Sequence, residues 1–400
     1  MGGGPWLDVV GIGEDGVAGL APAARAVLEA AEIVVGGDRH HRLSEAVTAE
    51  RIAWPHPFDA LTDRLRGLRG RRVVVLATGD PLWFSVGARL SRALGPGAIA
   101  FHPQISAFQL AACRMGWSLA DVETLTAHGR PVEGIVPLVS PGRRMLILAT
   151  GGATPGAVAR LLAGRGYGGS RMTALAAMGG PREARFEGTA AGWAAAVPDF
   201  HTLAVECVAG PGAVVHPSTG LPDAAFEHDG TMTKSEVRAV TLSRLMPGRG
   251  EMLWDVGAGC GSVSVEWMRA GRDMRAVGVE PRADRRALAA RNAQALGAPR
   301  LALVEGRAPD ALAGLEPPDA VFLVGGLSQE AGARCLDALR PLGRIVANAV
   351  TVEGEAVLAE MHARHGGDLV RLSVARCEPV GPRRGWRPAM PVTQWSLVKR

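Results

Sequence analysis

The feature that most limits the possible folds is a pattern that repeats along nearly the whole chain: short apolar runs alternate with Ala-, Leu- and Arg-rich stretches. The runs have the length of buried strands, and the stretches between them have the length and spacing of helices. This alternation is typical of α/β layering. The strands expected in the first half lie at 7–10, 33–35, 72–77, 98–101, 145–149, 172–176 and 202–208.

The pattern breaks once, between 209 and 231, where Gly, Pro, Ser and Asp form turn chemistry without periodicity. A chain of 400 residues is also too long for one ordinary core and suits two domains. We therefore expect one domain over 1–210 and a second over 211–400.

After the break, the pattern restarts with a helix at 234–245. Five parallel strands are expected, followed by a strand-like pair at the end of the chain. This layout predicts a doubly wound, Rossmann-like sheet with a reversed last strand. The five strands lie at 251–256, 275–279, 301–304, 319–324 and 343–349, and the final pair at 369–376 and 392–398.

Composition excludes several classes of protein. No apolar run approaches the ~18 residues of a membrane span, and the N-terminus lacks the pattern of a secretion signal. The five cysteines lie far apart without a Cys-x-x-Cys pair, which argues against a disulfide framework and a structural metal site. We expect a cytoplasmic enzyme that contains no metal and binds no membrane.

The net charge of +5 raises the question of nucleic acid. However, all the cations except Lys234 and Lys399 are arginines, and these are scattered along the chain. Guanidinium groups suit carboxylates, so we expect a small acidic ligand and no nucleic acid.

A glycine loop follows the first strand of the second half. There, Asp255 precedes a Gly-x-Gly-x-Gly turn that leads into a helix. Glycines turn tightly and expose bare amides to a ligand at a helix N-terminus. Glu280 ends the next strand, where a carboxylate accepts ribose hydroxyls. The candidate cofactor-binding residues of this loop are Asp255, Gly257, Ala258, Gly259, Cys260, Gly261 and Glu280.

The spacing of this loop is that of S-adenosylmethionine (SAM) methyltransferases, whereas dinucleotide enzymes favour Gly-x-Gly-x-x-Gly. An acid at Asp255 suits the cationic amino-acid end of SAM, although a structural role in the loop is the alternative. The loop at Gly306 and Ala308 follows the third strand, where such enzymes hold adenine. A two-domain NAD(P) oxidoreductase and an RNA methyltransferase remain alternatives, but the Asn-Pro-Pro-Tyr and Pro-Cys signatures of nucleic-acid methylation are absent.

In the first half, Val-Val-Gly11-Ile-Gly13 and Thr-Gly79-Asp80-Pro-Leu-Trp83 together resemble the tetrapyrrole methylases. The likeness continues through segments around Ser106, His128 and Thr150, although His128 could be an ordinary loop residue. It implies a bilobal α/β fold with SAM between the lobes. The SAM-binding residues implied by the resemblance are Gly11, Gly13, Gly79, Asp80, Trp83, Ser106, Ala107 and Thr150.

The fusion of such a half to a SAM methyltransferase that opens with Asp229-Gly-Thr-Met-Thr233-Lys234-Ser-Glu236 resembles the precorrin-6Y C5,15-methyltransferases (decarboxylating). The halves are similar to CbiE and CbiT proteins. The resemblance implies methylation of precorrin-6B at carbons 5 and 15 and decarboxylation of the ring C acetate, giving precorrin-8X in aerobic cobalamin biosynthesis. It also implies two SAM sites per chain, a polycarboxylate tetrapyrrole substrate and a homo-oligomer.

Methyl transfer from a sulfonium to an electron-rich ring carbon mainly needs positioning, so no catalytic dyad is expected. Decarboxylation needs a proton donor or a cation near the acetate. Glu236 and Lys234 are the candidate catalytic residues, and Thr233 is a candidate SAM contact. The alternative for Glu236 is a solvated helix N-terminus that complements the helix dipole.

Overall fold

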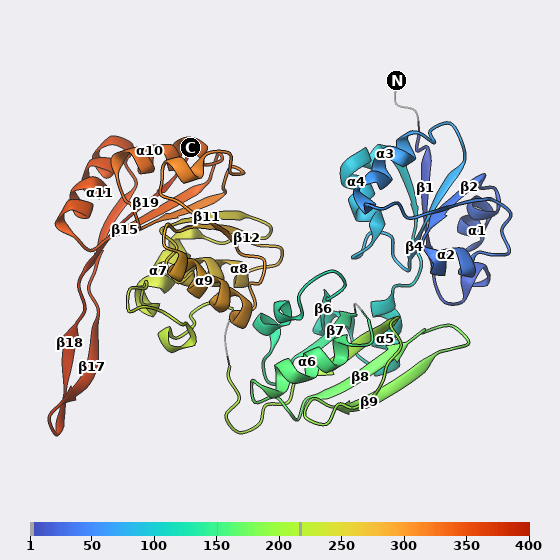
Figure 1. Cartoon of the computed structure of the whole chain (residues 1–400), viewed down its shortest axis with the longest axis horizontal. Helices are drawn as coiled ribbons and strands as arrows, with labels where there is room; N and C mark the ends of the chain where they lie inside the picture. Colours follow the sequence, from blue (N-terminus) through green and yellow to red (C-terminus); the bar gives the residue numbers. More distant parts are fainter. Residues whose placement is uncertain (1–3, 150, 216–217) are drawn as a thin grey trace. The chain divides into compact units, whose positions relative to one another are not determined.

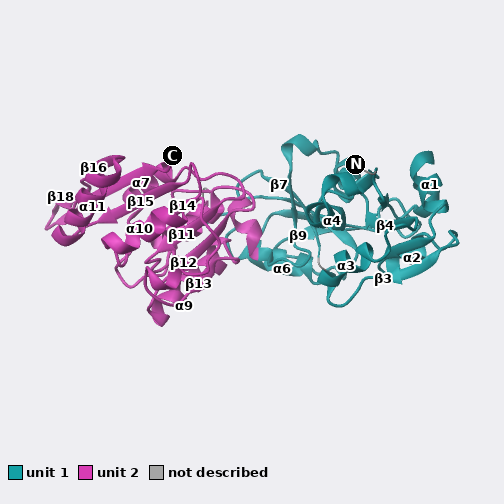
Figure 2. Cartoon of the chain, turned by 90° about the horizontal axis from the view of Figure 1, so that it is seen from above, with its two compact units in different colours: residues 1–132, 140–214 teal, residues 133–139, 215–400 magenta. Residues whose placement is uncertain are grey.

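The computed structural model describes residues 4–149, 151–215 and 218–400. The described residues form two compact units, which Figure 2 shows in different colours. The N-terminal unit contains residues up to 132 together with 140–214, and the C-terminal unit contains 133–139 and the chain from 215 onward. The boundary at residue 210 stays a prediction. Within the described residues, no helix is both long and apolar enough to cross a membrane.

The first lobe of the N-terminal unit, in blue in Figure 1, is a parallel sheet. Its strand order is β3-β2-β4-β1-β5. The central strand β4, Val-Val-Val-Leu-Ala-Thr, is buried along almost its whole length, as expected for a parallel sheet covered on both faces. The loops after these strands leave the same edge of the sheet. The strands are β1 (Leu7–Ile12), β2 (Ile33–Gly36), β3 (Glu50–Ala53), β4 (Val73–Thr78) and β5 (Ile99–His102), and the helices are α1 (Pro22–Glu29), α2 (Asp38–Leu43), α3 (Leu61–Arg66) and α4 (Val86–Leu94).

The second lobe is a mixed sheet with the order β6-β7-β10-β8-β9, in which only the β6–β7 pair is parallel among the described pairs. Helix α5 packs on it through Phe108 and Ala111, and Ser106 caps the helix by accepting the Gln109 N–H. The elements are α5 (Ala107–Met115), β6 (Glu123–Thr126), β7 (Arg144–Leu148), α6 (Thr154–Ala163), β8 (Arg171–Ala176), β9 (Ala184–Thr189) and β10 (His201–Glu206).

The C-terminal unit is a doubly wound sheet with the order β13-β12-β11-β14-β15-β19-β16. The strands are parallel from β13 to β15, and β19 then runs antiparallel to both of its neighbours. The elements are α7 (Ser235–Leu245), β11 (Met252–Val256), α8 (Ser262–Arg269), β12 (Arg275–Val279), α9 (Ala283–Leu296), β13 (Ala302–Val304), β14 (Ala320–Leu323), α10 (Gln329–Ala338), β15 (Arg344–Ala349), α11 (Val352–His365), β16 (Asp368–Leu372) and β19 (Val392–Val398).

An antiparallel hairpin, β17 (Ala375–Val380) with β18 (Arg383–Pro388), extends away from this sheet (Figure 1). We call this hairpin the arm. The run predicted as one strand at 369–376 is therefore divided between the end of β16 and the start of the arm. The predicted α/β class, with its bilobal first half and reversed last strand in the second half, is confirmed.

Candidate active sites

The glycine loop of the C-terminal unit joins β11 to α8. Gly257, Gly259 and Gly261 all have positive φ values, of 83°, 56° and 76°. A Cβ atom on Gly257 would lie 2.2 Å from the Cα of Gly325, in the loop after β14. Only glycine fits here, because two stretches of backbone approach each other without side chains. The result is a bare backbone edge where the carboxyl ends of β11 and β14 meet.

Glu280 lies directly after β12 and is only 3% exposed. Its Oε2 accepts the N–H of Gly259 at 3.0 Å, and its Oε1 accepts the N–H of Arg282 at 3.0 Å. The carboxylate therefore braces the glycine loop. Each oxygen keeps a second lone pair, so the predicted acceptance of ribose hydroxyls is compatible with this geometry.

Asp255 is buried one residue before the end of β11. Its Oδ2 accepts both the backbone N–H of Ser264 at 3.1 Å and the Ser264 hydroxyl at 2.5 Å. Burial raises the pKa of this carboxyl to about 6. Asp255 thus ties β11 to the first turn of α8, and its contact with SAM stays a prediction.

The other predicted residues of this loop contribute mainly backbone. Ala258 and Cys260 are buried, and burial raises the pKa of the Cys260 thiol. Gly306 has a φ of 137°, and a Cβ on it would lie 2.8 Å from the Cβ of Ala311. Ala308 packs against the main core of the unit. These side chains are small or inward-facing, so any ligand contact would use the backbone.

The segment before α7 lies beside the glycine loop. Asp229 accepts the N–H and the hydroxyl of Thr231, at 3.1 and 2.6 Å. Arg285 on α9 donates to both Asp229 and Thr231, and these hydrogen bonds lower the pKa of Asp229. The carbonyl oxygen of Thr231 is 3.9 Å from where a Cβ of Gly259 would be. The segment 229–236, which we call the entrance segment, is therefore held next to the candidate cofactor loop.

A buried ion pair anchors the other end of this segment. Arg238 on α7 donates from Nε to Glu266 at 2.5 Å and from Nη1 to the carbonyl oxygen of Thr233 at 2.6 Å. Glu266 on α8 also accepts the N–H groups of Gly220 and Leu221. Arg238 and Glu266 thus position Thr233. Sequence reasoning missed both roles, although Arg238 stands next to the motif.

The two candidate catalytic residues have different surroundings. Glu236 pairs with Arg376 of the arm, with its Oε2 2.6 Å from Nη2. Arg376 also donates to Asp223 at 2.9 Å. The hydrogen bond from Arg376 lowers the pKa of Glu236 to about 2, so this carboxyl is ionised at neutral pH. Lys234 is half-buried, and no protein partner of its amine is found in 4–149, 151–215 or 218–400.

The loops after β1, β4 and β5 converge in the N-terminal unit. A Cβ on Gly11 would lie 1.8 Å from the carbonyl oxygen of Gly79, and a Cβ on Gly79 would lie 2.9 Å from the Cα of Ser106. These contacts bring Gly11, Gly79, Ser106 and the adjoining Ala107 together. Their contact with SAM stays a prediction. A Cβ on Gly13 would lie 2.6 Å from Oδ1 of Asp15.

Asp80 and Trp83 shape the loop after β4. The carboxylate of Asp80 accepts the N–H of Leu82 at 2.8 Å. Trp83 is half-exposed and contacts Phe108 edge-on. The predicted contact Thr150 lies outside the described residues.

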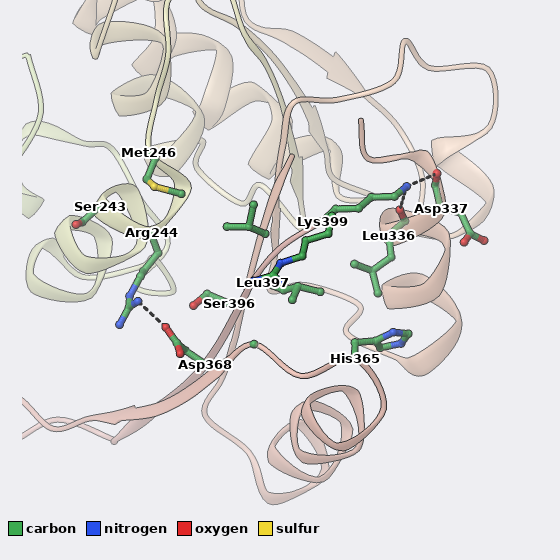
Figure 3. Close-up of a pocket in the computed structure, with 13 residues that line it drawn as sticks. Ser243, Arg244, Met246, Leu336, Asp337, His365, Asp368, Ser396, Leu397 and Lys399 are labelled. Carbon is green, nitrogen blue, oxygen red and sulfur yellow. Dashed lines mark hydrogen bonds and ion pairs between the residues drawn. The ribbon is translucent and has the colours of Figure 1, made fainter. Parts of the chain in front are cut away.

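A cavity of about 900 Å³ lies elsewhere in the C-terminal unit (Figure 3). It is lined by residues that include Arg244, Asp368 and Lys399. Val398 pairs with Arg344 at the amino end of β15, so this cavity is at the opposite edge of the sheet from the glycine loop. Arg244 pairs with Asp368 at 2.8 Å, and Lys399 donates to carbonyl oxygens at the end of α10. The Arg244–Asp368 pair therefore joins α7 to β16, and the Lys399 amine fixes the residue after β19 to the end of α10. Among the described residues, no acidic, His or Cys cluster is placed to hold a metal.

Comparisons with known proteins match each half of the chain to a methyltransferase family. The family described as "Tetrapyrrole (Corrin/Porphyrin) Methylases" matches residues 7–193, and the family described as "Precorrin methyltransferase domain" matches residues 224–399. Among curated proteins, the chain is 46% identical to "Precorrin-6Y C(5,15)-methyltransferase [decarboxylating]" from Sinorhizobium sp, over 99% of this chain and 97% of the relative.

Two shorter relatives each match less than half of the chain. One is "Cobalt-precorrin-7 C(5)-methyltransferase" from Salmonella typhimurium, 32% identical over 40% of this chain and 80% of the relative. The other is "Probable cobalt-precorrin-6B C(15)-methyltransferase (decarboxylating)" from Pyrobaculum calidifontis, 40% identical over 42% of this chain and 87% of the relative. Because each half matches a methyltransferase family and a full-length relative is 46% identical, the chain belongs to the precorrin-6Y C(5,15)-methyltransferase (decarboxylating) family.

Proposed function

We propose that this chain methylates precorrin-6B at carbons 5 and 15 and removes the ring C acetate carboxyl as CO2, giving precorrin-8X in aerobic cobalamin biosynthesis. The observation that carries the proposal is the presence of a separate glycine-loop site in each unit, around Gly79 and around Gly257. Family membership supports SAM as the methyl donor. We propose two SAM sites per chain, one in each unit.

The two activities are assigned to separate units. We propose that the C-terminal unit decarboxylates and methylates carbon 15, and that the N-terminal unit methylates carbon 5. The two shorter relatives support this division, because each is named for one of the two methylations alone and only the C(15) relative is named as decarboxylating.

The residues of the C-terminal loop fit SAM. The close contact between Gly257 and Gly325 leaves their backbone bare of side chains. Each carboxylate oxygen of Glu280 accepts one backbone N–H and has a second lone pair that can accept a ribose hydroxyl. When bound, SAM supplies an electrophilic methyl group to a ring carbon that is already nucleophilic. The protein positions the two reactants and excludes water. Asp255 and Glu280 favour a cationic ligand.

For the decarboxylation, the geometry separates the two catalytic candidates. A carboxyl whose pKa is about 2 holds no proton to donate at neutral pH, so Glu236 is better suited to fixing Arg376. Lys234 is half-buried at the entrance segment and is free to contact an acetate or deliver a proton. We therefore propose Lys234 as the group acting on the substrate and Glu236 as a positioning residue.

Further proposals concern the assembly and its setting. The arm supports a homo-oligomer, because Trp386 and Val380 are 75% and 64% exposed on it. Light scattering on the intact chain tests this. We also propose a polycarboxylate tetrapyrrole substrate, no nucleic-acid or membrane partner and a cytoplasmic location.

The decisive experiment is mass spectrometry of the product formed from precorrin-6B and SAM. The expected product has gained two methyl groups and lost one CO2. Calorimetry with SAM should give a stoichiometry near two per chain. One SAM per chain would overturn the two-site proposal, and binding of nicotinamide cofactor or salt-sensitive binding of RNA would support the alternatives.

A further inference from the structure

A polar cluster at the end of β4 converges on the hydroxyl of Thr78. Its Oγ1 is 3.0 Å from Nη1 of Arg39 and 3.1 Å from Nε2 of His40, both on α2. A guanidinium only donates hydrogen bonds. The Nδ1 of His40 accepts the N–H of Gly37 at 3.2 Å, so the neutral ring carries its proton on Nε2 and donates it to Thr78. Burial and the charge of Arg39 lower the pKa of His40 to about 4, which keeps the ring neutral at pH 7.

Arg39 is held in place from two other sides. Its Nε donates to Oε1 of Glu14, in the loop after β1, at 2.6 Å. Its guanidinium carbon also lies 3.7 Å from the ring centre of Phe200. The Glu14 side chain is only 7% exposed, so this is not a loose surface pair. The donor that Arg39 directs at Thr78 is therefore fixed before any ligand binds.

The consequence concerns the proton of the Thr78 hydroxyl. A hydroxyl has two acceptor lone pairs and one proton, and Arg39 and His40 occupy both lone pairs. The proton must therefore point elsewhere, and no protein acceptor for it is found in 4–149, 151–215 or 218–400. Two donors on one oxygen also polarise the O–H bond and strengthen it as a donor. Thr78 comes directly before Gly79 and Asp80, in the candidate SAM loop.

We propose that the Thr78 hydroxyl donates a hydrogen bond to a ligand carboxylate in the N-terminal unit, and that Arg39 and His40 are the positioning residues that aim it. The carboxylate is that of the methionine part of SAM or an acid side chain of the tetrapyrrole. This inference rests on the proposed function for its ligands, but binding experiments test it without turnover.

The test compares Thr78→Val, which keeps the side-chain shape and loses the hydroxyl, with Thr78→Ser, which keeps the hydroxyl. Calorimetry on the whole chain measures binding of S-adenosylhomocysteine and of methylthioadenosine, which lacks the carboxylate. All variants in this test also carry Glu280→Gln. This substitution lowers ligand affinity at the C-terminal site, so that binding there can be told apart from binding at the N-terminal site. Thr189→Val is the matched control, because Thr189 also ends a strand and its hydroxyl accepts a backbone N–H.

If the SAM carboxylate is the acceptor, Thr78→Val lowers the affinity for S-adenosylhomocysteine about ten- to a hundredfold and leaves the affinity for methylthioadenosine unchanged. Thr78→Ser, which keeps the hydroxyl, then retains the original affinity for S-adenosylhomocysteine. If the substrate carboxylate is the acceptor, nucleoside binding is unchanged and the KM for the tetrapyrrole in carbon-5 methylation rises by a similar factor with kcat retained. Equal weakening of both nucleosides would show a merely structural hydroxyl and overturn the proposal. Unchanged nucleoside affinities together with an unchanged KM for the tetrapyrrole would also overturn the proposal. Absence of carbon-5 methylation in the unmodified chain would instead refute the proposed function.

Discussion

The brace formed by Glu280 makes the strongest quantitative prediction for the C-terminal site. In Glu280→Gln, the side chain keeps its shape but replaces one acceptor oxygen with an NH2 group. The structure gives each carboxylate oxygen one backbone N–H, from Gly259 and from Arg282, and leaves one lone pair on each for the ribose. The amide can therefore satisfy only one backbone N–H and one ribose hydroxyl.

The loss of one hydrogen bond to a charged acceptor costs about 1.5–3 kcal/mol, or about a tenfold to hundredfold loss of affinity. Calorimetry with SAM should show this loss at one of two sites and leave the other unchanged. Glu305→Gln is the control, because the Glu305 side chain is 75% exposed and pairs with Arg286 at the surface. The affinity of the Glu305→Gln variant for SAM should stay within about threefold of that of the unsubstituted chain, since exposed ion pairs contribute only about 0.2–1 kcal/mol. Unchanged affinity at both sites in Glu280→Gln would refute the assignment of Glu280 to the ribose.

The remaining predictions concern charges near the entrance segment and in the loop. Arg238→Met should lower the free energy of unfolding of the C-terminal unit by about 3–5 kcal/mol, because it leaves Glu266 buried without its cationic partner. Urea unfolding followed by hydrogen exchange measures this loss, and adding Glu266→Gln should recover most of it. A loss below about 1 kcal/mol would contradict the role of the pair. Glu236→Gln should slow CO2 release less than about tenfold, whereas Lys234→Met should slow it by about 10²–10⁴ with SAM affinity retained; the opposite ranking would make Glu236 the acid. Burial raises the pKa of Asp255 to about 6, above its unfolded value, so this group stabilises the fold below about pH 4 and that contribution, roughly 3 kcal/mol, is lost as the pH rises to about 6. In Asp255→Asn, the free energy of unfolding from urea titrations should not fall in this way between about pH 4 and pH 6. The same pH dependence in the variant and the unsubstituted chain would show that Asp255 is not the group responsible.

The parallel layers could be predicted because their signals are local. The strand β11, its glycine turn and the start of α8 are adjacent in sequence, and buried runs such as β4 are apolar on both faces. The strands that escaped prediction, which are β3, β6, β9 and most of the arm, lack that signal. β9 alternates between half-buried and exposed residues, and the arm is exposed along most of both strands. These strands are defined by backbone pairing, which leaves little trace in apolar periodicity.

The chemistry of the entrance segment could be only partly predicted. The motif places Lys234 and Glu236 at the start of α7, but the protonation state of Glu236 depends on a partner 140 positions later in the chain. Nothing in the composition of the arm identifies Arg376 as that partner. A carboxylate next to a substrate loop was therefore a reasonable candidate acid, and a contact between distant segments is what favours a positioning role instead.

The glycine loops of the two candidate sites are held in place by different kinds of contact. In the C-terminal unit, buried carboxylates from neighbouring strands hold the glycine turn, with Glu280 accepting the Gly259 N–H and Asp255 tied to the start of α8. In the N-terminal unit, the loops are held by direct backbone contact between Gly11 and Gly79, and the fixed side chains at the strand end are the donors Arg39 and His40. The first arrangement offers acceptors, and the second offers donors. The ligand that we propose for both sites has a cation, ribose hydroxyls and a carboxylate, and it would use different atoms at each site. A substitution that weakens binding at one site should therefore leave binding at the other intact.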